Sequence, residues 1–264
     1  MKLTIIGCSG SMSGPESPAS GYLVEATGND AGTGRDVALT LDFGPGVMGK
    51  LLAYRDPALL DAMLFSHLHA DHCADLVGMQ VYRRWYPGGE VPRVPLYSPQ
   101  DGRRRLIQLA DDDPTDTYED EFDFHHVNPG DSFEVGPLHV EAFAANHTVE
   151  ALCYRITGPS DARPGEQATL TFTGDTDYAP SVVEAARGAD TLLSEAAFEE
   201  GRDTVRGVHM TGKRAGELAR SAGVRDLLLT HLQPWTDPDE VVTEARGAFS
   251  GRVTAVRAGQ TYRI

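Results

Sequence analysis

The segment from Ser66 to His72, with the sequence SHLHADH, constrains the fold of this chain more than any other stretch. It carries four potential metal ligands within six residues and directly follows the apolar run Ala62–Phe65. A short, continuous apolar run followed by polar residues is typical of a buried strand. We therefore expect the ligands on a loop at the carboxyl end of that strand, where α/β proteins place their chemistry.

The spacing within the segment favours metal binding. His67 and His69 lie two positions apart, so they point to the same side of an extended chain, and Asp71 and His72 follow as the chain turns. The whole chain has 9 His in 264 residues, so three histidines within six positions seldom arise by chance. Imidazole and carboxylate groups suit Zn²⁺, Mn²⁺ or Fe. One short loop of this kind can supply ligands to two metals, whereas the alternative is a polar loop with incidental histidines.

The pattern His-x-His-x-Asp-His resembles the signature of the metallo-β-lactamase superfamily, which requires further ligands downstream. Candidates for these ligands occur in the required order, and each follows an apolar or β-prone run: His147, Asp175 and His231. The resemblance implies two metal sites, with His67, His69 and His147 in one, Asp71, His72 and His231 in the other, and Asp175 as the bridge. It implies Zn²⁺ as the usual metal, although Mn²⁺ and Fe also fit such ligands. The match runs over nearly the whole chain.

The order of the expected elements predicts an αββα sandwich, the metallo-β-lactamase fold. Strands occur in two groups, each followed by helices, which suits two facing mixed β-sheets with helices outside. Tyr22–Ala26 and Val37–Asp42 are expected to pair around a turn at Gly28–Asp30, and Val253–Val256 is expected to be the last strand. Between the strands Phe124–Val127 and Leu138–Ala144 we expect only turns. Nothing resembling a linker divides the chain, so we predict one domain over residues 1–264.

Composition limits the partners and the compartment. The formal net charge is −16, which argues against a general nucleic-acid surface but not against a small anionic substrate, because divalent cations can reverse the local field. The three cysteines, Cys8, Cys73 and Cys153, are widely spaced and odd in number, which fits a reducing cytoplasm better than a disulfide framework. The chain shows no signal-peptide pattern and no apolar run of transmembrane length, so we predict a cytoplasmic protein without a membrane partner.

A second functional candidate precedes the expected helix Lys213–Ala222. In the phosphodiesterase branch of the superfamily a His-x-Thr stretch lies at this point, and its histidine is placed to contact the scissile phosphate and act as general acid. His209 matches that histidine, so the resemblance implies a catalytic role for it, beside Asp71 of the first segment. The alternative is a helix-capping loop with a chance histidine. Glu195 is a candidate to orient His209, and Asp42 is a candidate either to orient a metal-binding histidine or to cap the helix that follows it.

Several other segments and residues are each compatible with two interpretations. The segment 82–86, YRRWY, could stack a purine and pair with a phosphate, or it could be a helix end whose arginines reach solvent. The acidic segment 111–121 could be a mobile flap over the site or a solvated loop, and Cys73 could be a reactive thiol near a metal or a small buried residue. His125, His126 and His139 receive no role from the family pattern and are expected at surface or structural positions.

The interval between His147 and Asp175 bears on the substrate. Only 27 residues separate them, whereas the tRNA 3′-processing endonucleases of the superfamily usually carry a long basic arm there to grip tRNA. Together with the negative net charge, this short interval argues against tRNA and in favour of a small phosphodiester. The segments GCSGS at 7–11 and LLLTHLQPW at 227–235 are similar to actinobacterial members associated with hydrolysis of cyclic nucleotides.

The sequence therefore predicts a dinuclear-metal phosphodiesterase that converts 3′,5′-cyclic nucleotides to 5′-monophosphates. The two metals would lower the pKa of a bridging water and bind phosphate oxygens, while His209 would protonate the leaving alkoxide. One alternative is a ribonuclease that processes tRNA 3′ ends and recruits its arm function from a dimer partner. Another is a catalytically weak nucleotide-sensing module on the same scaffold. Homodimers are common among relatives, so a second copy of the chain is a candidate partner.

Overall fold

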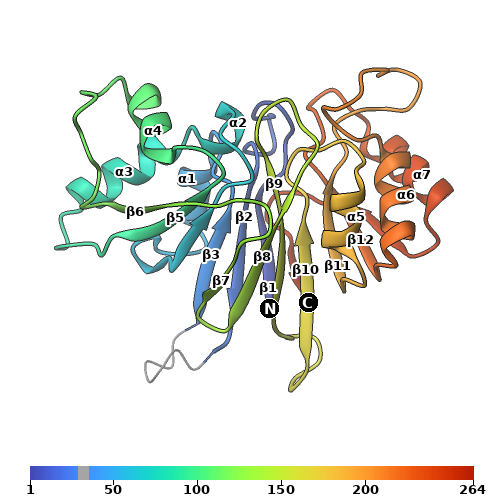
Figure 1. Ribbon diagram of the computed structural model, residues 1–264, viewed down its shortest axis with the longest axis horizontal. Helices are drawn as coiled ribbons and strands as arrows, with labels where there is room; N and C mark the ends of the chain where they lie inside the picture. The colour runs from blue at the N-terminus through green and yellow to red at the C-terminus, as the bar shows by residue number, and fades with distance from the viewer. Residues whose placement is uncertain (29–35) are drawn as a thin grey trace.

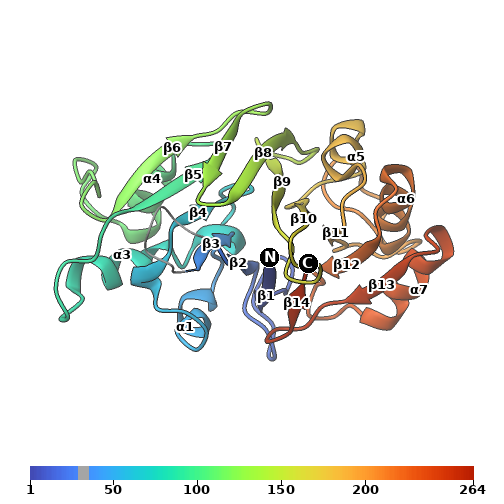
Figure 2. The same cartoon turned by 90° about the horizontal axis from the view of Figure 1, so that it is seen from below.

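Two facing β-sheets with helices on both outer faces form the molecule, which confirms the αββα arrangement expected from the sequence (Figure 1). The computed structural model describes residues 1–28 and 36–264, so the turn expected at Gly28–Asp30 lies largely outside the described residues. The two termini lie side by side near the middle of the molecule (Figure 2), where the Ile264 N–H donates to the Met1 carbonyl at 2.9 Å.

The N-terminal half of the chain and its last strand form the first sheet. Its strands are β1 (Lys2–Gly7), β2 (Gly21–Ala26), β3 (Val37–Leu41), β4 (Ala62–Leu64), β5 (Val94–Ser98), β6 (Phe122–His126) and β14 (Thr261–Arg263). Across the sheet they follow the order β14-β1-β2-β3-β4-β5-β6. The pairs from β14 to β3 are antiparallel, and the pairs from β3 to β6 are parallel.

The C-terminal half forms the second sheet. Its strands are β7 (Ser132–Val135), β8 (Leu138–Ala144), β9 (Leu152–Pro159), β10 (Gln167–Phe172), β11 (Thr191–Glu195), β12 (Asp226–Thr230) and β13 (Arg252–Ala255). Across the sheet they run in the order β13-β12-β11-β10-β9-β8-β7, with antiparallel pairs from β7 to β10 and parallel pairs from β10 to β13. Both sheets are mixed, and in each the parallel strands end at a common edge.

The structure contains two strands that were not predicted from the sequence. The expectation of turns alone before Leu138 and the expectation of a last strand at Val253–Val256 were therefore both wrong. β7 lies in the stretch where only turns are expected, and it pairs antiparallel with β8 through Phe133 and Val140. β14 follows β13, so Val253–Val256 is not the last strand; Tyr262 pairs with Leu3 of β1. Each is a short strand at a sheet edge with few apolar residues, so its own sequence pattern is weak. Each is stabilised by pairing with a neighbouring strand, which is β8 for β7 and the distant β1 for β14.

The helices cover the outer faces of the two sheets. They are α1 (Val47–Leu51), the 3₁₀ helix η1 (Pro57–Leu59), α2 (Ala70–Cys73), α3 (Leu76–Trp85), α4 (Gly102–Ala110), α5 (Pro180–Ala186), α6 (Gly212–Ala222) and α7 (Pro238–Ala248). α1 to α4 lie beside the first sheet and α5 to α7 beside the second (Figure 1). Thr211 starts α6 by accepting the Arg214 N–H at 3.2 Å, and Gly223 ends it with a left-handed φ of 67°. Among the described residues, none of these helices has the length and apolar character that a membrane span requires.

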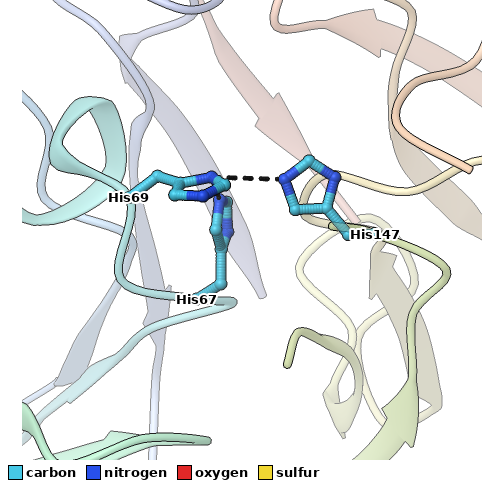
Figure 3. A group of neighbouring side chains, drawn as sticks. All are labelled: His67, His69 and His147. Carbon is cyan, nitrogen blue, oxygen red and sulfur yellow. Dashed lines mark hydrogen bonds between the residues drawn. The ribbon is translucent and has the colours of Figure 1, made fainter. Parts of the chain in front are cut away.

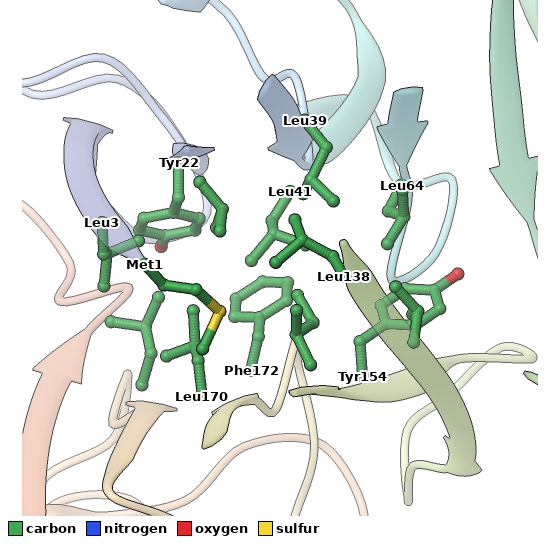
Figure 4. Packing of buried hydrophobic residues seen from close by; sticks show 14 of the residues in the cluster. Met1, Leu3, Tyr22, Leu39, Leu41, Leu64, Leu138, Tyr154, Leu170 and Phe172 are labelled. Carbon is green, nitrogen blue, oxygen red and sulfur yellow. The ribbon is translucent and has the colours of Figure 1, made fainter. Parts of the chain in front are cut away.

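Large apolar side chains fill the space between the sheets (Figure 4). The Tyr22 and Phe172 rings pack with their centroids 5.2 Å apart. The Tyr22 hydroxyl lies 2.8 Å from Thr230 Oγ1, and the Tyr154 hydroxyl donates to the Phe65 carbonyl at 3.0 Å, so these buried polar atoms are satisfied. Thr230 is the last residue of β12 and Phe65 directly follows β4, and both strands lead into loops with predicted ligands. The core side chains Tyr22 and Tyr154 therefore help to fix the start of those loops.

Candidate metal centre

The first ligand segment combines an extended loop with a short helix. The chain leaves β4 through Phe65, whose N–H donates to the Tyr97 carbonyl at 2.8 Å and so keeps the strand direction. His69 has φ −63° and ψ 152°, and the helix α2 begins directly after it. The extended part therefore presents His67 and His69, and the helical turn presents Asp71 and His72.

The other predicted residues come from four separate loops: His147 after β8, Asp175 after β10, His209 before α6 and His231 after β12. The loop of Asp175 packs closely against the first ligand segment. A Cβ on Gly174 would lie only 2.4 Å from Ser66 Cβ, and the φ of Gly174 is +56°. Only glycine suits that position. His231 also has a left-handed φ, of 58°, a conformation that is uncommon in non-glycine residues.

His67, His69 and His147 form a first cluster of potential ligands. His69 Nδ1 lies 2.9 Å from His67 Nε2 and 3.2 Å from His147 Nε2. Figure 3 shows the three rings turned toward one another, with His147 on a loop of its own. A metal held about 2.0–2.1 Å from three tetrahedrally arranged nitrogens would keep those nitrogens about 3.3 Å apart. The separations in the structure therefore suit three ligands of one metal.

Asp71, His72, Asp175 and His231 form a second cluster. His72 Nε2 lies 3.3 Å from Asp71 Oδ2 and 3.2 Å from Asp175 Oδ2. His231 Nε2 lies 3.4 Å from the same Asp175 oxygen. That oxygen is also 3.9 Å from His67 Nε2 of the first cluster. Asp175 is thus positioned between the clusters, as a bridging ligand would be.

Hydrogen bonds at Nδ1 set the direction of four histidines. The pairs are His67 with Ser66 Oγ at 3.1 Å, His72 with Asp42 Oδ2 at 2.7 Å, His147 with the Val208 carbonyl at 2.8 Å, and His231 with Ser20 Oγ at 2.9 Å. With Nδ1 engaged, Nε2 is the nitrogen whose lone pair can bind a metal. Asp42 therefore contacts a predicted ligand in the way considered from the sequence. The other three partners are not evident from the sequence, because a serine or a carbonyl carries no distinguishing pattern.

The electrostatics of the second cluster fit a cation. His72 Nε2 and Asp175 Oδ1 are buried and make no well-formed hydrogen bond within the described residues. Burial lowers the pKa of His72, but the carboxylates of Asp175 and Asp42 outweigh it and raise that pKa well above its usual value. Burial lowers the pKa of His67 and of His231, which favours the neutral imidazole that metals bind. The carboxylates thus favour a positive charge at this point, and the two clusters are consistent with a dinuclear metal site.

His209 lies beside both clusters. Its Nδ1 is 3.0 Å from Glu195 Oε1 and 3.8 Å from Asp175 Oδ2. Its ring lies 5.5 Å from the rings of His147 and His231, measured between centroids. Burial lowers the pKa of His209, but the charge and hydrogen bond of Glu195 outweigh it and raise the pKa to about 9. Glu195 therefore contacts His209 as expected from the sequence.

Asp177 connects the loops of three predicted residues and is not evident from the sequence. Its N–H donates to the Asn146 carbonyl at 2.8 Å, next to His147. Its Oδ2 accepts the Gly207 N–H at 2.8 Å, and its Oδ1 forms a buried ion pair with Arg214. Asp177 therefore ties two loops to the loop of Asp175: its backbone N–H holds the His147 loop, and its carboxylate holds the His209 loop. Such a role depends on tertiary contacts, which the local sequence does not reveal.

A pocket of about 580 Å³ adjoins the first cluster at Leu68 and His69. Its walls are residues 99–101, helix α4, His126 at the end of β6 and residues 149–150; we call it the α4 pocket. His126 is exposed, as expected from the sequence, and it also lines this pocket. His125 stacks on Tyr97 with ring centroids 4.7 Å apart, and His139 Nδ1 lies 2.6 Å from Glu134 Oε1, so these two have structural partners.

The segment 82–86 does not line the α4 pocket and contacts none of the predicted ligands. Arg83 is buried and donates to the carbonyls of Pro57 and Pro92. Arg84 pairs with Asp116 and Glu121, so it holds the acidic segment 111–121 against α3. The segment 82–86 is therefore the end of a helix that fixes neighbouring loops, and the structure favours this interpretation over purine stacking.

Cys73 is fully buried next to the first ligand segment. Burial raises the pKa of its thiol to about 11, with Arg105 acting in the opposite direction. The thiol donates to the Leu68 and His69 carbonyls at 3.4 Å and 3.2 Å. The structure therefore favours the small buried residue over the reactive thiol.

Comparisons with known proteins cover the whole chain. Residues 39–232 match the family described as "Beta-lactamase superfamily domain". An uncharacterised protein of Mycobacterium leprae is 40% identical over 266 residues, which cover 100% of this chain and 89% of that protein. The Bacillus subtilis protein YhfI, named a probable metallo-hydrolase, is 30% identical over 98% of both chains. Its crystal structure, of a metallo-beta-lactamase fold protein, has a TM-score of 0.83 at 29% identity over 99% of both chains. A Methanopyrus kandleri protein named ribonuclease Z is 28% identical over 99% of this chain and 97% of its own length.

These comparisons agree with the geometry of the two clusters. The matched residues 39–232 include all seven predicted ligands. The similarity to YhfI extends over both sheets and the loops between them. The chain therefore belongs to the beta-lactamase superfamily, as a metallo-hydrolase related to YhfI and to ribonuclease Z.

Proposed function

We propose that this chain is a metal-dependent phosphodiesterase that hydrolyses small phosphodiesters, with 3′,5′-cyclic nucleotides as substrates and 5′-monophosphates as products. One observation carries the proposal: His209 lies beside two ligand clusters, with Asp175 of the second cluster next to His67 of the first. Phosphodiester hydrolysis needs positive charge for the phosphate oxygens and a proton donor for the leaving oxygen. This arrangement offers both.

The cations would be held by the two clusters, with Asp175 between them. When bound, two divalent cations neutralise phosphate oxygens and lower the pKa of a water molecule. Asp42, Ser20 and Ser66 would keep the ligating histidines oriented. We propose Zn²⁺ as the resident metal, because histidine-rich ligand sets are common in catalytic zinc sites, and Mn²⁺ or Fe suits the same donors.

His209 would supply the proton for the leaving oxygen. Glu195 engages Nδ1, so Nε2 is the nitrogen that can face a substrate. Attack of water on phosphorus breaks the P–O3′ bond, and the proton of Nε2 passes to the departing 3′ oxygen. Asp71 has 18% of its side chain exposed, against 4% or less for the other members of its cluster. It is therefore the member of its cluster best placed to accept a hydrogen bond from the attacking water.

Two features support a small substrate. The interval from His147 to Asp175 holds β9, β10, the connection between them and short segments at either end, and the β9–β10 connection lies at the end of the molecule opposite α2 (Figure 1). It leaves no room for an arm that could grip a folded RNA. The net charge of −16 also disfavours a long polyanion, although it does not prevent a small one from reaching a cationic centre.

A ribonuclease is the second candidate, because the relative named ribonuclease Z aligns over nearly the whole chain. In that case a second copy of the chain would have to supply the missing grip on RNA. Cleavage of a precursor tRNA at low enzyme concentration, with cyclic nucleotides left intact, would favour it.

The test is hydrolysis of cAMP and cGMP by protein loaded with Zn²⁺ or Mn²⁺, with His209→Ala beside it. The matched control is His139→Ala, since His139 is half-exposed and pairs with Glu134 outside the centre. We expect 5′-monophosphate from the wild type and the control, and little from His209→Ala. Tight nucleotide binding without turnover would point instead to a sensing module. Cleavage of bis-p-nitrophenyl phosphate alone would leave the chemistry in place and refute the cyclic-nucleotide substrate.

A further inference from the structure

We propose that the α4 pocket binds the nucleobase of the substrate, an inference that rests on the proposed function and names where its specificity lies. The pocket opens beside His69, so a phosphate at the metal centre would be adjacent to it. His147 contacts both His69 and His209, with ring centroids 5.1 Å and 5.5 Å away. The acid candidate and the α4 pocket therefore lie next to different members of the first cluster.

The volume of the pocket suits the non-reacting part of a nucleotide. Its roughly 580 Å³ falls within the range of about 300–1,000 Å³ that is usual for small-molecule sites. A single phosphate would fill only a small part of it.

The charges in the pocket favour a heterocycle over a second phosphate. Arg104 and Arg105 are matched there by Asp101 and Glu150, so the formal charges of these four residues cancel. Gln100 and Gln108 add amide groups that both donate and accept hydrogen bonds. A nucleobase carries donors and acceptors on its edges, whereas a phosphate would meet two carboxylates. The mixture therefore fits the base better.

Two of the lining side chains are free to contact a ligand. Within the described residues, neither the Arg104 guanidinium nor the Gln108 amide makes a side-chain hydrogen bond or an ion pair. Only the backbone N–H of Arg104 is engaged, by the Asp101 carboxylate that caps α4. A guanidinium plane can stack on an aromatic base, and Arg and Gln are common hydrogen-bonding partners of purine edges. The segment 82–86 does not line this pocket, whereas the Arg104 guanidinium and the ring of His126 are among its planar groups.

The test separates the base from the phosphate by equilibrium binding to metal-loaded protein. AMP and GMP are compared with ribose 5-phosphate, which carries the same phosphate and sugar without a base. The variants are Arg104→Ala and Gln108→Ala. Arg103→Ala is the matched control, because Arg103 lies on the same helix but donates to the Asp116 carbonyl and does not line the pocket.

We expect the wild type to bind the better of the two nucleotides more tightly than ribose 5-phosphate. Arg104→Ala and Gln108→Ala should each lower the affinity for that nucleotide roughly three- to tenfold and leave the affinity for ribose 5-phosphate unchanged. Both variants should also raise the KM for the cyclic nucleotide. Arg103→Ala should change none of these values.

Two results would overturn the proposal. One is that the wild type binds the nucleotide and ribose 5-phosphate with equal affinity. The other is that Arg104→Ala loses the same affinity for both ligands, which would identify the pocket as an anion site. Because binding is measured without turnover, failure of the proposed function is distinguishable. A protein that hydrolyses no cyclic nucleotide but loses base-dependent affinity in these variants would refute the activity and support the pocket.

Discussion

The two halves of the sandwich contribute to the same centre in different ways. The N-terminal half supplies four potential ligands from the single segment 67–72. The C-terminal half supplies His147, Asp175, His209 and His231 from four loops that are separated by whole strands and helices. One loop and one helical turn can arrange the first group. The second group comes together only when β8, β10 and β12 are aligned and the second sheet has packed against the first.

The contacts that support each group differ in the same way. Asp42 orients His72 within the N-terminal half. Ser20, also from the N-terminal half, reaches across to His231, and Gly174 of the C-terminal half packs against Ser66. The scattered ligands therefore depend on the contact between the halves, whereas the contiguous ligands depend mainly on their own surroundings.

The largest effect should come from Asp175→Ala, which removes the side chain positioned between the two clusters. We expect the metal content, measured by mass spectrometry of the purified protein, to fall by about one ion per chain or more. Activity should fall by more than the roughly 10²–10³-fold that a single donor typically contributes. Asp123→Ala, at a half-exposed carboxylate of β6, is the control and should keep both. An Asp175→Ala protein with full metal content would contradict the bridging position.

The next effect should come from His209→Ala, which removes the one C-terminal residue that is proposed to act without binding metal. We expect kcat to fall roughly 10²–10³-fold with the metal content unchanged. His209 also forms a close group with His147 and Asp175, so a ligand role is the competing assignment. Loss of a metal ion in this variant would establish that role and remove His209 as the proton donor.

A smaller effect should separate the two kinds of support. Asp42→Asn keeps the size and the left-handed backbone position but weakens the hydrogen bond to His72, so metal affinity should fall roughly 10–100-fold in competition with a chelator. Ser20→Ala removes a neutral partner of His231 and should cost less. If Ser20→Ala proves the more damaging change, support across the halves outweighs support within the N-terminal half.

The smallest change is a methyl group at Gly174, where the two halves are in close contact. Gly174→Ala combines a left-handed φ with a Cβ 2.4 Å from Ser66 Cβ, so we expect a loss of about 2–4 kcal/mol in the free energy of unfolding by urea. Gly188→Ala is matched, because its φ is +63° and a Cβ there would have no neighbour within 4 Å. It should cost only about 1 kcal/mol. Equal losses in the two variants would mean that the contact at Gly174 is not tight.

The same contrast explains what the sequence alone could predict. The segment 67–72 carries its chemistry locally, so its pattern indicated the superfamily and hence the fold and the order of the distant ligands. The structure brings all seven predicted ligands and His209 together. Asp42 and Glu195, considered as partners from the sequence, contact His72 and His209.

What the sequence could not predict depends on tertiary contacts. Ser20 and Asp177 are ordinary polar residues until distant loops pack against them. The strands β7 and β14 are short edge strands that exist because a neighbour pairs with them. The segment 82–86 has the composition of a nucleotide platform and of a helix end, and only its position decides between the two. The α4 pocket is formed by residues from separate loops and α4, so no single stretch indicates it.

The most direct test of a dinuclear centre built from both halves is anomalous diffraction from crystals of the protein loaded with Zn²⁺ or Mn²⁺. We expect two peaks, roughly 3.5–4 Å apart, one among His67, His69 and His147 and the other among Asp71, His72 and His231, with Asp175 touching both. A single peak, or peaks bound by residues of one half alone, would contradict the shared centre.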